Sequence, residues 1–281
     1  MTRELGALEL LLDTATGPEL PLPAPLARFY GSMRLGATGD RPHLFGNFVS
    51  SLDGVVALGE PGTGGDEISG KSREDHAVMG LLRAIADVIV VGAGTLRAFP
   101  KHVWTPEAIY APWAETYSEL RRALGKKEPP LTVLVTARGD LDPALPIFAS
   151  GRAPCLVVTT ARGARTLAER GMPVEVRVAG DGTRLKAGEI LEALPLAAGT
   201  RVLLECGPHL MARFFEEERV DELFLTLAPQ VAGRSPEAPR DGFVAGALLL
   251  PDHPAWADLQ GVRRCGSLLF LRYRFPASKP K

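Results

Sequence analysis

The chain has 281 residues, of which 46% are hydrophobic and 23% are charged, and its formal net charge is −1. This composition is typical of a globular protein with a sizeable core, and the near-zero charge gives no electrostatic reason to expect nucleic acid or an anionic membrane as a partner. The first residues, MTRELGALELLLDTATG, lack the apolar run of a signal peptide, and no stretch approaches the ~20 apolar residues of a membrane span. We therefore expect neither nucleic acid nor a membrane as a partner.

The cysteines and histidines do not indicate a metal centre. Cys155, Cys206 and Cys265 are far apart, so the sequence offers neither a disulfide framework nor a Cys-x-x-Cys motif. The five histidines show no H-x-x-x-H or H-E-x-x-H spacing. We expect no metal, and a reducing cytoplasm is the compartment that this cysteine usage favours.

The chain begins with a stretch that differs from the rest. Residues 1–40 contain the Pro-rich turn GPELPLPAP and the amphipathic stretch LARFYGSMRLG, which predict an N-terminal arm with one short helix. Residues 41–281 are expected to form a single domain. Within it, the aromatic-rich segment 99–130 interrupts the pattern and is predicted to be an excursion with a helix around AETYSELRRAL.

The first part of the domain is predicted to contain a strand, a turn and a helix. Residues 44–58, LFGNFVSSLDGVVAL, are rich in β-branched and aromatic residues and are broken by Asp53-Gly54, which indicates a strand and a turn. A Gly-rich loop is expected over 59–65. Residues 72–87 predict a helix, because Ser72 is a suitable N-cap and apolar residues recur at helical spacing.

From residue 88 onward, apolar strands alternate with amphipathic helices. Continuously apolar strands between helices indicate a largely parallel sheet covered by helices on both faces, with antiparallel strands at the carboxyl end. The predicted strands cover 88–92, 132–136, 155–160, 174–180, 201–205, 221–233 and 267–275, and the predicted helices cover 161–171, 187–194 and 208–220.

The stretch GDEISGKS at 65–72 matches the G-x-x-x-x-G-K-[ST] pattern of a phosphate-binding P-loop. A P-loop follows an apolar strand, whereas GEPGTG precedes Gly65, and the only near match to a downstream magnesium carboxylate is Glu205. A nucleotide hydrolase is therefore disfavoured, and Ser72 is expected to begin a helix.

Two other turns join a strand to a helix through small residues. VIVVGAGTLRAF (88–99) contains Gly92, Gly94 and Thr95 but lacks the third glycine and the acidic residue of a Rossmann motif. RVLLECGPHLM (201–211) places Glu205 at a strand end. Taken alone, the first turn could equally serve close packing. Together the two turns suggest a diphosphate held from two sides by backbone N–H groups and helix N-termini.

The order of FVSSLDG, EISG, LLRAIADVIVVGAGTLRA and LLECGPHLMARFFEEERVDELFLTLAPQVAG resembles the reductase domain of bacterial riboflavin biosynthesis over about residues 44–275. The resemblance implies a dihydrofolate-reductase-like α/β fold, NADPH as cofactor, and reduction of a ribosylaminopyrimidine phosphate to its ribityl form. It also implies a homodimer, for which an exposed strand such as 222–228 would need a partner.

The resemblance also implies site residues. Arg83 would meet the substrate's phosphate, Glu205 its sugar or base, and Gly65 would also contact it. Asp53 is a candidate proton donor, although closing its Asp-Gly turn is the more ordinary role. The positions implied for the cofactor are Val49, Glu67, Gly92, Gly94, Thr95, Thr136, Arg138, Gly207, Pro208, His209 and Leu210.

Several positions depart from the family pattern. Glu67 replaces a tryptophan at an expected strand edge, and Phe99-Pro100-Lys101-His102 replaces an acid-acid-proline stretch. The zinc signature of the companion deaminase does not occur, so we expect only the reductase half. Two alternatives remain open beside the pyrimidine reductase: a dihydrofolate or pteridine reductase of the same fold, and a non-catalytic NADPH-binding protein.

Overall fold

A single mixed sheet runs through the computed structural model, which describes residues 5–36, 39–59, 63–180 and 182–276. Its ten strands are β1 (Glu9–Asp13), β2 (His43–Ser50), β3 (Val88–Gly92), β4 (Leu131–Thr136), β5 (Cys155–Thr159), β6 (Glu175–Val178), β7 (Arg201–Leu204), β8 (Glu222–Leu227), β9 (Asp258–Cys265) and β10 (Leu268–Arg274). They lie in the order β1-β9-β10-β8-β2-β7-β3-β4-β5-β6.

The seven strands from β8 to β6 are parallel to one another, whereas β1, β9 and β10 form an antiparallel edge in which β10 pairs with β8. The helices are α1 (Ala24–Tyr30), α2 (Gly65–Ser69), α3 (Arg73–Ile85), α4 (Ala93–Ala98), α5 (Pro106–Ile109), η1 (Ala111–Trp113), α6 (Ala114–Ala123), α7 (Pro146–Ala149), α8 (Ala161–Glu169), α9 (Ala187–Glu192) and α10 (Pro208–Glu216).

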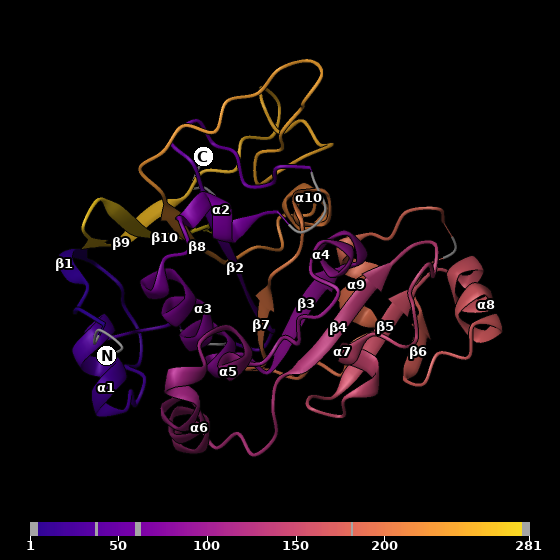
Figure 1. Cartoon of the computed structure of the whole chain (residues 1–281), viewed down its shortest axis with the longest axis horizontal. Helices are drawn as coiled ribbons and strands as arrows, with labels where there is room; N and C mark the ends of the chain where they lie inside the picture. The colour runs from indigo at the N-terminus through magenta and orange to yellow at the C-terminus, as the bar shows by residue number, and fades with distance from the viewer. Residues whose placement is uncertain (1–4, 37–38, 60–62, 181, 277–281) are drawn as a thin grey trace.

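Helices cover both faces of the sheet (Figure 1). One buried cluster joins α1, α3 and α6 to side chains such as Leu203 and Leu134, and a second joins α9 and α10 to side chains such as Leu204 and Val133. Successive strand residues thus enter opposite clusters, as the two-residue period of a strand requires. The expected mixed, mostly parallel sheet with helices on both faces is confirmed.

The aromatic-rich segment 99–130 packs on α3. Gly80 of α3 has no room for a side chain, because an added Cβ would lie 2.4 Å from the Tyr117 ring of α6. The Tyr117 hydroxyl donates a hydrogen bond to the Ala77 carbonyl oxygen at 3.0 Å. Trp113 makes edge contacts with Phe29 of α1 and with Tyr117. The segment therefore packs against both α1 and α3. The helix predicted within it is α6.

Three features differ from the sequence-based expectations. Strands β1 and β9 were not predicted, and the stretch expected to be a strand edge at Glu67 forms the short helix α2. Strand β8 is paired with both β10 and β2, so it is not the exposed strand on which a dimer was argued. Of the Gly-rich loop expected over 59–65, residues 60–62 lie outside the described residues.

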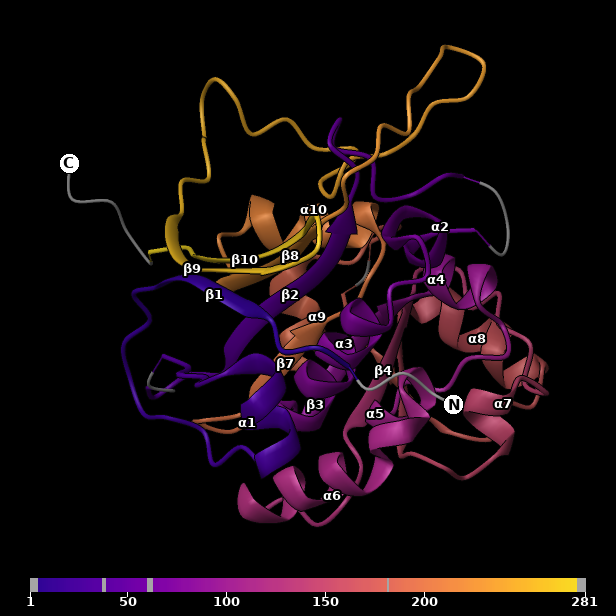
Figure 2. The same cartoon turned by 60° about the vertical axis from the view of Figure 1, so that its left-hand side comes forward.

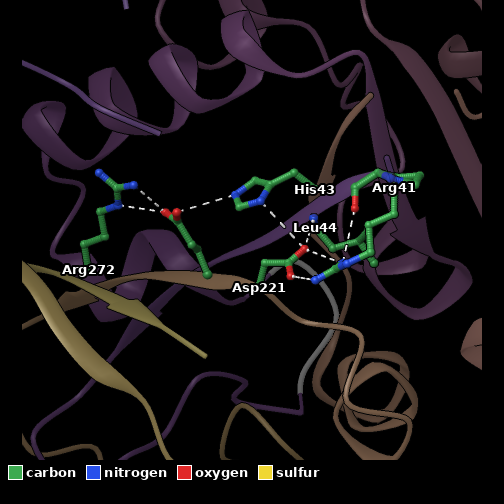
Figure 3. Close-up of polar contacts among 7 residues, drawn as sticks. Arg41, His43, Leu44, Asp221 and Arg272 are labelled. Carbon is green, nitrogen blue, oxygen red and sulfur yellow. Dashed lines mark hydrogen bonds and ion pairs between the residues drawn. The ribbon is translucent and has the colours of Figure 1, made fainter. Parts of the chain in front are cut away.

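Charged side chains tie together the amino-terminal ends of β2 and β8 (Figure 3). Glu222, 1% exposed, accepts from Arg272 Nε at 2.7 Å, and His43 lies between Glu222 and Asp221. Burial alone would raise the pKa of Glu222, but His43 and Arg272 outweigh it and lower the pKa below its usual value. This network anchors the strands at the end opposite to their carboxyl ends.

Candidate active site

The predicted site residues gather where the parallel strands end. Val49, Gly92 and Glu205 stand at or just past the carboxyl ends of β2, β3 and β7. Val49 pairs in register with Thr226 of β8. Carboxyl ends of parallel strands share one edge of the sheet, and open α/β sheets place ligands in the crevice outside that edge. In both views the long segment between β8 and β9 runs above α2 and α10 beyond this edge (Figures 1 and 2).

The two glycine-bearing turns lie against each other. An ideal Cβ at Gly92 would be 3.6 Å from Leu210 Cδ2 and 3.9 Å from the Gly207 nitrogen, and one at Gly207 would be 3.4 Å from Thr95 Oγ1. A Cβ at Gly94 would meet nothing within 4 Å. These are ordinary or open distances, so protein packing does not require glycine there. Glycine leaves the backbone N–H groups open to a ligand, as a diphosphate would need.

Arg83 and Glu205 form a buried ion pair beside these turns. Arg83 is 1% exposed and Glu205 8%. Arg83 Nε and Nη2 donate to the carboxylate at 2.9 and 2.7 Å, the two-pronged geometry that makes such pairs strong. Arg83 Nη1 donates to His102 Nε2 at 2.9 Å and to the Thr105 carbonyl oxygen at 3.1 Å. The guanidinium implied to meet a phosphate is thus largely occupied by protein acceptors.

Asp75 is a further buried carboxyl group of this region, and no motif in the sequence marks it. It lies in the first turn of α3, is 4% exposed, and hydrogen-bonds with the Thr226 side chain. Burial raises the pKa of Asp75 to about 6, and the nearby Asp66 and Glu205 carboxylates add to the rise. A buried carboxyl with a pKa near neutrality can both hold and release a proton, as an acid catalyst must.

In the sequence, Asp75 lies in the polar run Lys71–His76, of the kind that begins many helices. Only its contact with Thr226 of β8 distinguishes Asp75 from an ordinary acidic residue in the first turn of a helix. His102 was noted only as a departure from the family pattern. Its position one turn after α4 gave no sign that it would contact Arg83.

Asp53 does not fit the role of a proton donor. Its carboxylate accepts from Ser51 Oγ at 2.7 Å and from the backbone N–H groups of Ala232 and Gly233, each at 2.9 Å. These bonds, that of Ser51 first, lower the pKa of Asp53 to about 2. It remains an anion at neutral pH and links the turn after β2 to residues 232–233, which corrects its candidate catalytic role.

Glu67 is explained by helix capping. Its Oε2 accepts the Gly64 N–H at 2.7 Å, which satisfies a backbone donor that the start of α2 would otherwise leave free. The side chain is exposed and committed to this bond. Gly65 lies close to the site, because an added Cβ there would be 3.2 Å from Val49 Cγ1. The stretch 65–72 is thus a short helix and a turn, without the strand that a P-loop follows.

The remaining cofactor positions lie around the two turns. Gly92 pairs with Val135, so Thr136 is one strand and one residue away; Thr136 is buried and its Oγ1 accepts the Gly139 N–H at 3.1 Å. Arg138 is exposed two residues further on. Pro208 begins α10, where its missing N–H costs no hydrogen bond, and His209 next to it is exposed.

Among residues 5–36, 39–59, 63–180 and 182–276, no helix is long and apolar enough to cross a lipid bilayer. In the same residues, no three or more His, Cys, Asp or Glu side chains are grouped so as to hold a metal ion.

Residues 42–258 match the family model of the RibD C-terminal domain. A curated relative is the 2,5-diamino-6-ribosylamino-4(3H)-pyrimidinone 5′-phosphate reductase of Archaeoglobus fulgidus, 27% identical over 72% of this chain and 87% of the relative.

Solved structures show the same fold. A pyrimidine reductase-like protein of Corynebacterium diphtheriae superposes with a TM-score of 0.64, at 24% identity, over 88% of this chain and 96% of that chain. A deaminase/5-amino-6-(5-phosphoribosylamino)uracil reductase of Thermotoga maritima gives a TM-score of 0.59 at 18% identity, over 84% of this chain and 57% of the larger protein. The family match confirms the resemblance seen in the sequence: the chain belongs to the RibD C-terminal domain family.

Proposed function

We propose that the protein is an NADPH-dependent reductase that acts on a ribosylaminopyrimidine phosphate. The observation that carries the proposal is the meeting of two open glycine turns, at Gly92 and Gly207, beside the buried Arg83–Glu205 pair and the Asp75 carboxyl. The turns fit a diphosphate, and the charged groups fit a polar substrate next to it. The name of the archaeal relative supports the substrate class.

Each part of the site has a distinct task in this proposal. The backbone of the two turns and the N-terminus of α10 hold the diphosphate, and Val49 contacts the nicotinamide. Thr136 and Arg138 lie on the side expected for the 2′-phosphate. NADPH held there would supply the hydride for reduction at C1′ of the opened, imine-like ribosylamine. The chain's own contribution is to orient the substrate, chiefly through Glu205, whose carboxylate Arg83 fixes in place.

Asp75 replaces Asp53 as the proposed source of the proton. Reduction of a C=N bond adds a hydride to carbon and a proton to nitrogen. With a pKa of about 6, Asp75 is partly protonated near neutral pH, whereas Asp53, with a pKa of about 2, is not. The transfer leaves a carboxylate that the Thr226 hydrogen bond stabilises, and solvent water then returns a proton to Asp75.

The same carboxyl favours a second candidate, a reductase of dihydrofolate or another pteridine. A buried carboxyl that hydrogen-bonds with Thr226 can pair with the N–H edge of an aminopyrimidine ring, and pteridines carry that edge too. What separates the two substrates is the ribosyl phosphate, which only the pyrimidine substrate carries.

Absorbance-monitored oxidation of NADPH tests the proposal. The purified protein should oxidise NADPH with the ribosylaminopyrimidine phosphate and much more slowly with dihydrofolate. The reverse preference would establish the second candidate. NADPH binding without turnover on either substrate would leave a non-catalytic NADPH-binding protein.

The proposed enzyme is a cytoplasmic homodimer. Cys155, Cys206 and Cys265 are all unpaired, as in a reducing compartment. An apolar groove of about 530 Å³, which Phe243 and Trp256 help to line, opens beside β8 and β10, and Leu248 and Leu250 nearby are 95% and 72% exposed. Exposed apolar residues of this size favour contact with another chain. Sedimentation equilibrium should give twice the chain mass, and a monomer across the concentration range would refute the dimer.

A further inference from the structure

His102 lies in the segment between α4 and α5, where the chain departs from the family pattern. Its backbone N–H donates to the Phe99 carbonyl oxygen at 3.0 Å, which closes a turn. Its imidazole meets the buried Trp104 indole edge-on, with ring centroids 5.0 Å apart and an interplanar angle of 86°. The turn therefore fixes the backbone of His102, and the contact with Trp104 fixes its ring.

The bond between His102 and Arg83 defines the state of the imidazole. Arg83 Nη1 lies 2.9 Å from His102 Nε2. A guanidinium has only donors, so Nε2 must accept, and the neutral ring then carries its proton on Nδ1. Burial, followed by the charges of Arg83 and His76, lowers the pKa of His102 to about 3. His102 thus stays neutral over the pH range in which the protein would work and does not serve as a proton donor.

The two hydrogens of Arg83 Nη1 have one acceptor each, His102 Nε2 and the Thr105 carbonyl oxygen. Nε and Nη2 are directed to Glu205 on the other side of the guanidinium. Both ends of this planar group are therefore fixed. Without the His102 acceptor, one buried N–H would have no partner, and the guanidinium would gain freedom to turn away from Glu205.

We propose that His102 is a positioning residue of the reductase site, whose neutral imidazole holds the Arg83 guanidinium in the plane in which it binds Glu205. Through this chain of contacts, the segment 99–105 controls the orientation of the substrate-binding carboxylate. The inference rests on the proposed function for Glu205, but the contact between His102 and Arg83 does not depend on which substrate is reduced.

Two substitutions at His102 distinguish the role of its hydrogen-bond acceptor from the role of its planar ring. His102→Phe keeps a planar ring beside Trp104 but accepts no hydrogen bond, and it should raise the substrate KM by about tenfold to a hundredfold with little change in kcat or in NADPH affinity. His102→Gln offers a carbonyl oxygen and should restore KM to within about threefold of the original. Lys101→Ala, at the exposed neighbouring position, is the matched control.

Equal KM values for the Phe and Gln variants would overturn the proposal, as would a loss in both that is confined to kcat. If the Phe variant does not fold, NMR of the original protein labelled with ¹⁵N in histidine remains decisive. The His102 ring should stay neutral, with the proton on Nδ1, from about pH 5 to about pH 8. A charged ring or an Nε2 proton would refute the inference. This measurement needs no substrate, so it separates failure of the inference from failure of the proposed function.

Discussion

Replacing Asp75 by asparagine should stabilise the protein and at the same time impair its reaction. The pKa of Asp75 is raised from 3.8 to about 6 in the folded protein. The folded state therefore holds this proton more tightly than the unfolded state does. As pH rises from about 4 to about 6, the unfolded chain loses the proton first, and the free energy of unfolding falls. The cost of the buried carboxylate is fully present above about pH 6.

A shift of about two pKa units corresponds to about 3 kcal/mol of unfolding free energy. Asparagine removes the charge and keeps the shape, although losing an acid from the first turn of α3 offsets up to about 1 kcal/mol. Near neutral pH, Asp75→Asn should thus be more stable by about 2 kcal/mol, which raises Tm by a few degrees in a chain of this length. Near pH 4 the two proteins should be equally stable.

Urea unfolding followed by circular dichroism at several pH values measures this difference. Turnover of NADPH with the pyrimidine substrate should fall by a factor of about 10² to 10⁴, because asparagine has no proton to give. In the original protein the rate of the reductive step should decline as pH rises through about 6. A variant that is less stable at neutral pH, or fully active, would refute the reasoning about this carboxyl.

Three further changes test other parts of the account. Glu205→Gln leaves the buried Arg83 charge poorly paired, and should lower the free energy of unfolding by about 3 kcal/mol and raise the substrate KM; an unchanged KM in steady-state kinetics would exclude substrate contact. Gly207→Ala should weaken NADPH binding in fluorescence titration without changing Tm, because the added Cβ would lie at an ordinary 3.4 Å from Thr95 Oγ1; Gly6→Ala, where an added Cβ would meet nothing within 4 Å, should change neither. Glu222→Gln should cost about 3 kcal/mol at neutral pH, and this deficit should shrink in acid as pH falls through the lowered pKa of Glu222, because the original carboxylate is then protonated.

The parallel part of the sheet could be predicted from the sequence because its strands are short, apolar and separated by amphipathic helices. The antiparallel edge of the sheet was harder to predict from the sequence. Strand β9, DLQGVRRC, mixes charged residues with a glycine, and β1, ELLLD, is exposed along its whole length. Their strand conformation depends on pairing with β10 and with each other, which local sequence does not reveal.

In the site, too, some features follow from local sequence and others depend on residues that are distant in the chain. The glycine turns could be picked out in the sequence because each joins a strand to a helix through small residues, and the structure brings them against each other. The chemistry of the carboxyl groups could not, because a pKa depends on burial and on neighbours distant in sequence. Asp53, in a visible Asp-Gly turn, is a fixed anion, whereas Asp75, in an ordinary helix start, has a pKa near neutrality. Glu67, which resembled a departure in the cofactor site, caps α2.

Transfer of an isotope from the cofactor tests the central claim most directly. NADPH deuterated at the transferable C4 position of the nicotinamide is incubated with the protein and the ribosylaminopyrimidine phosphate, and the product is analysed by mass spectrometry and NMR. The account predicts one deuterium per product molecule, at C1′ of the ribityl chain. Product without deuterium, or no product although NADPH binds, would contradict it.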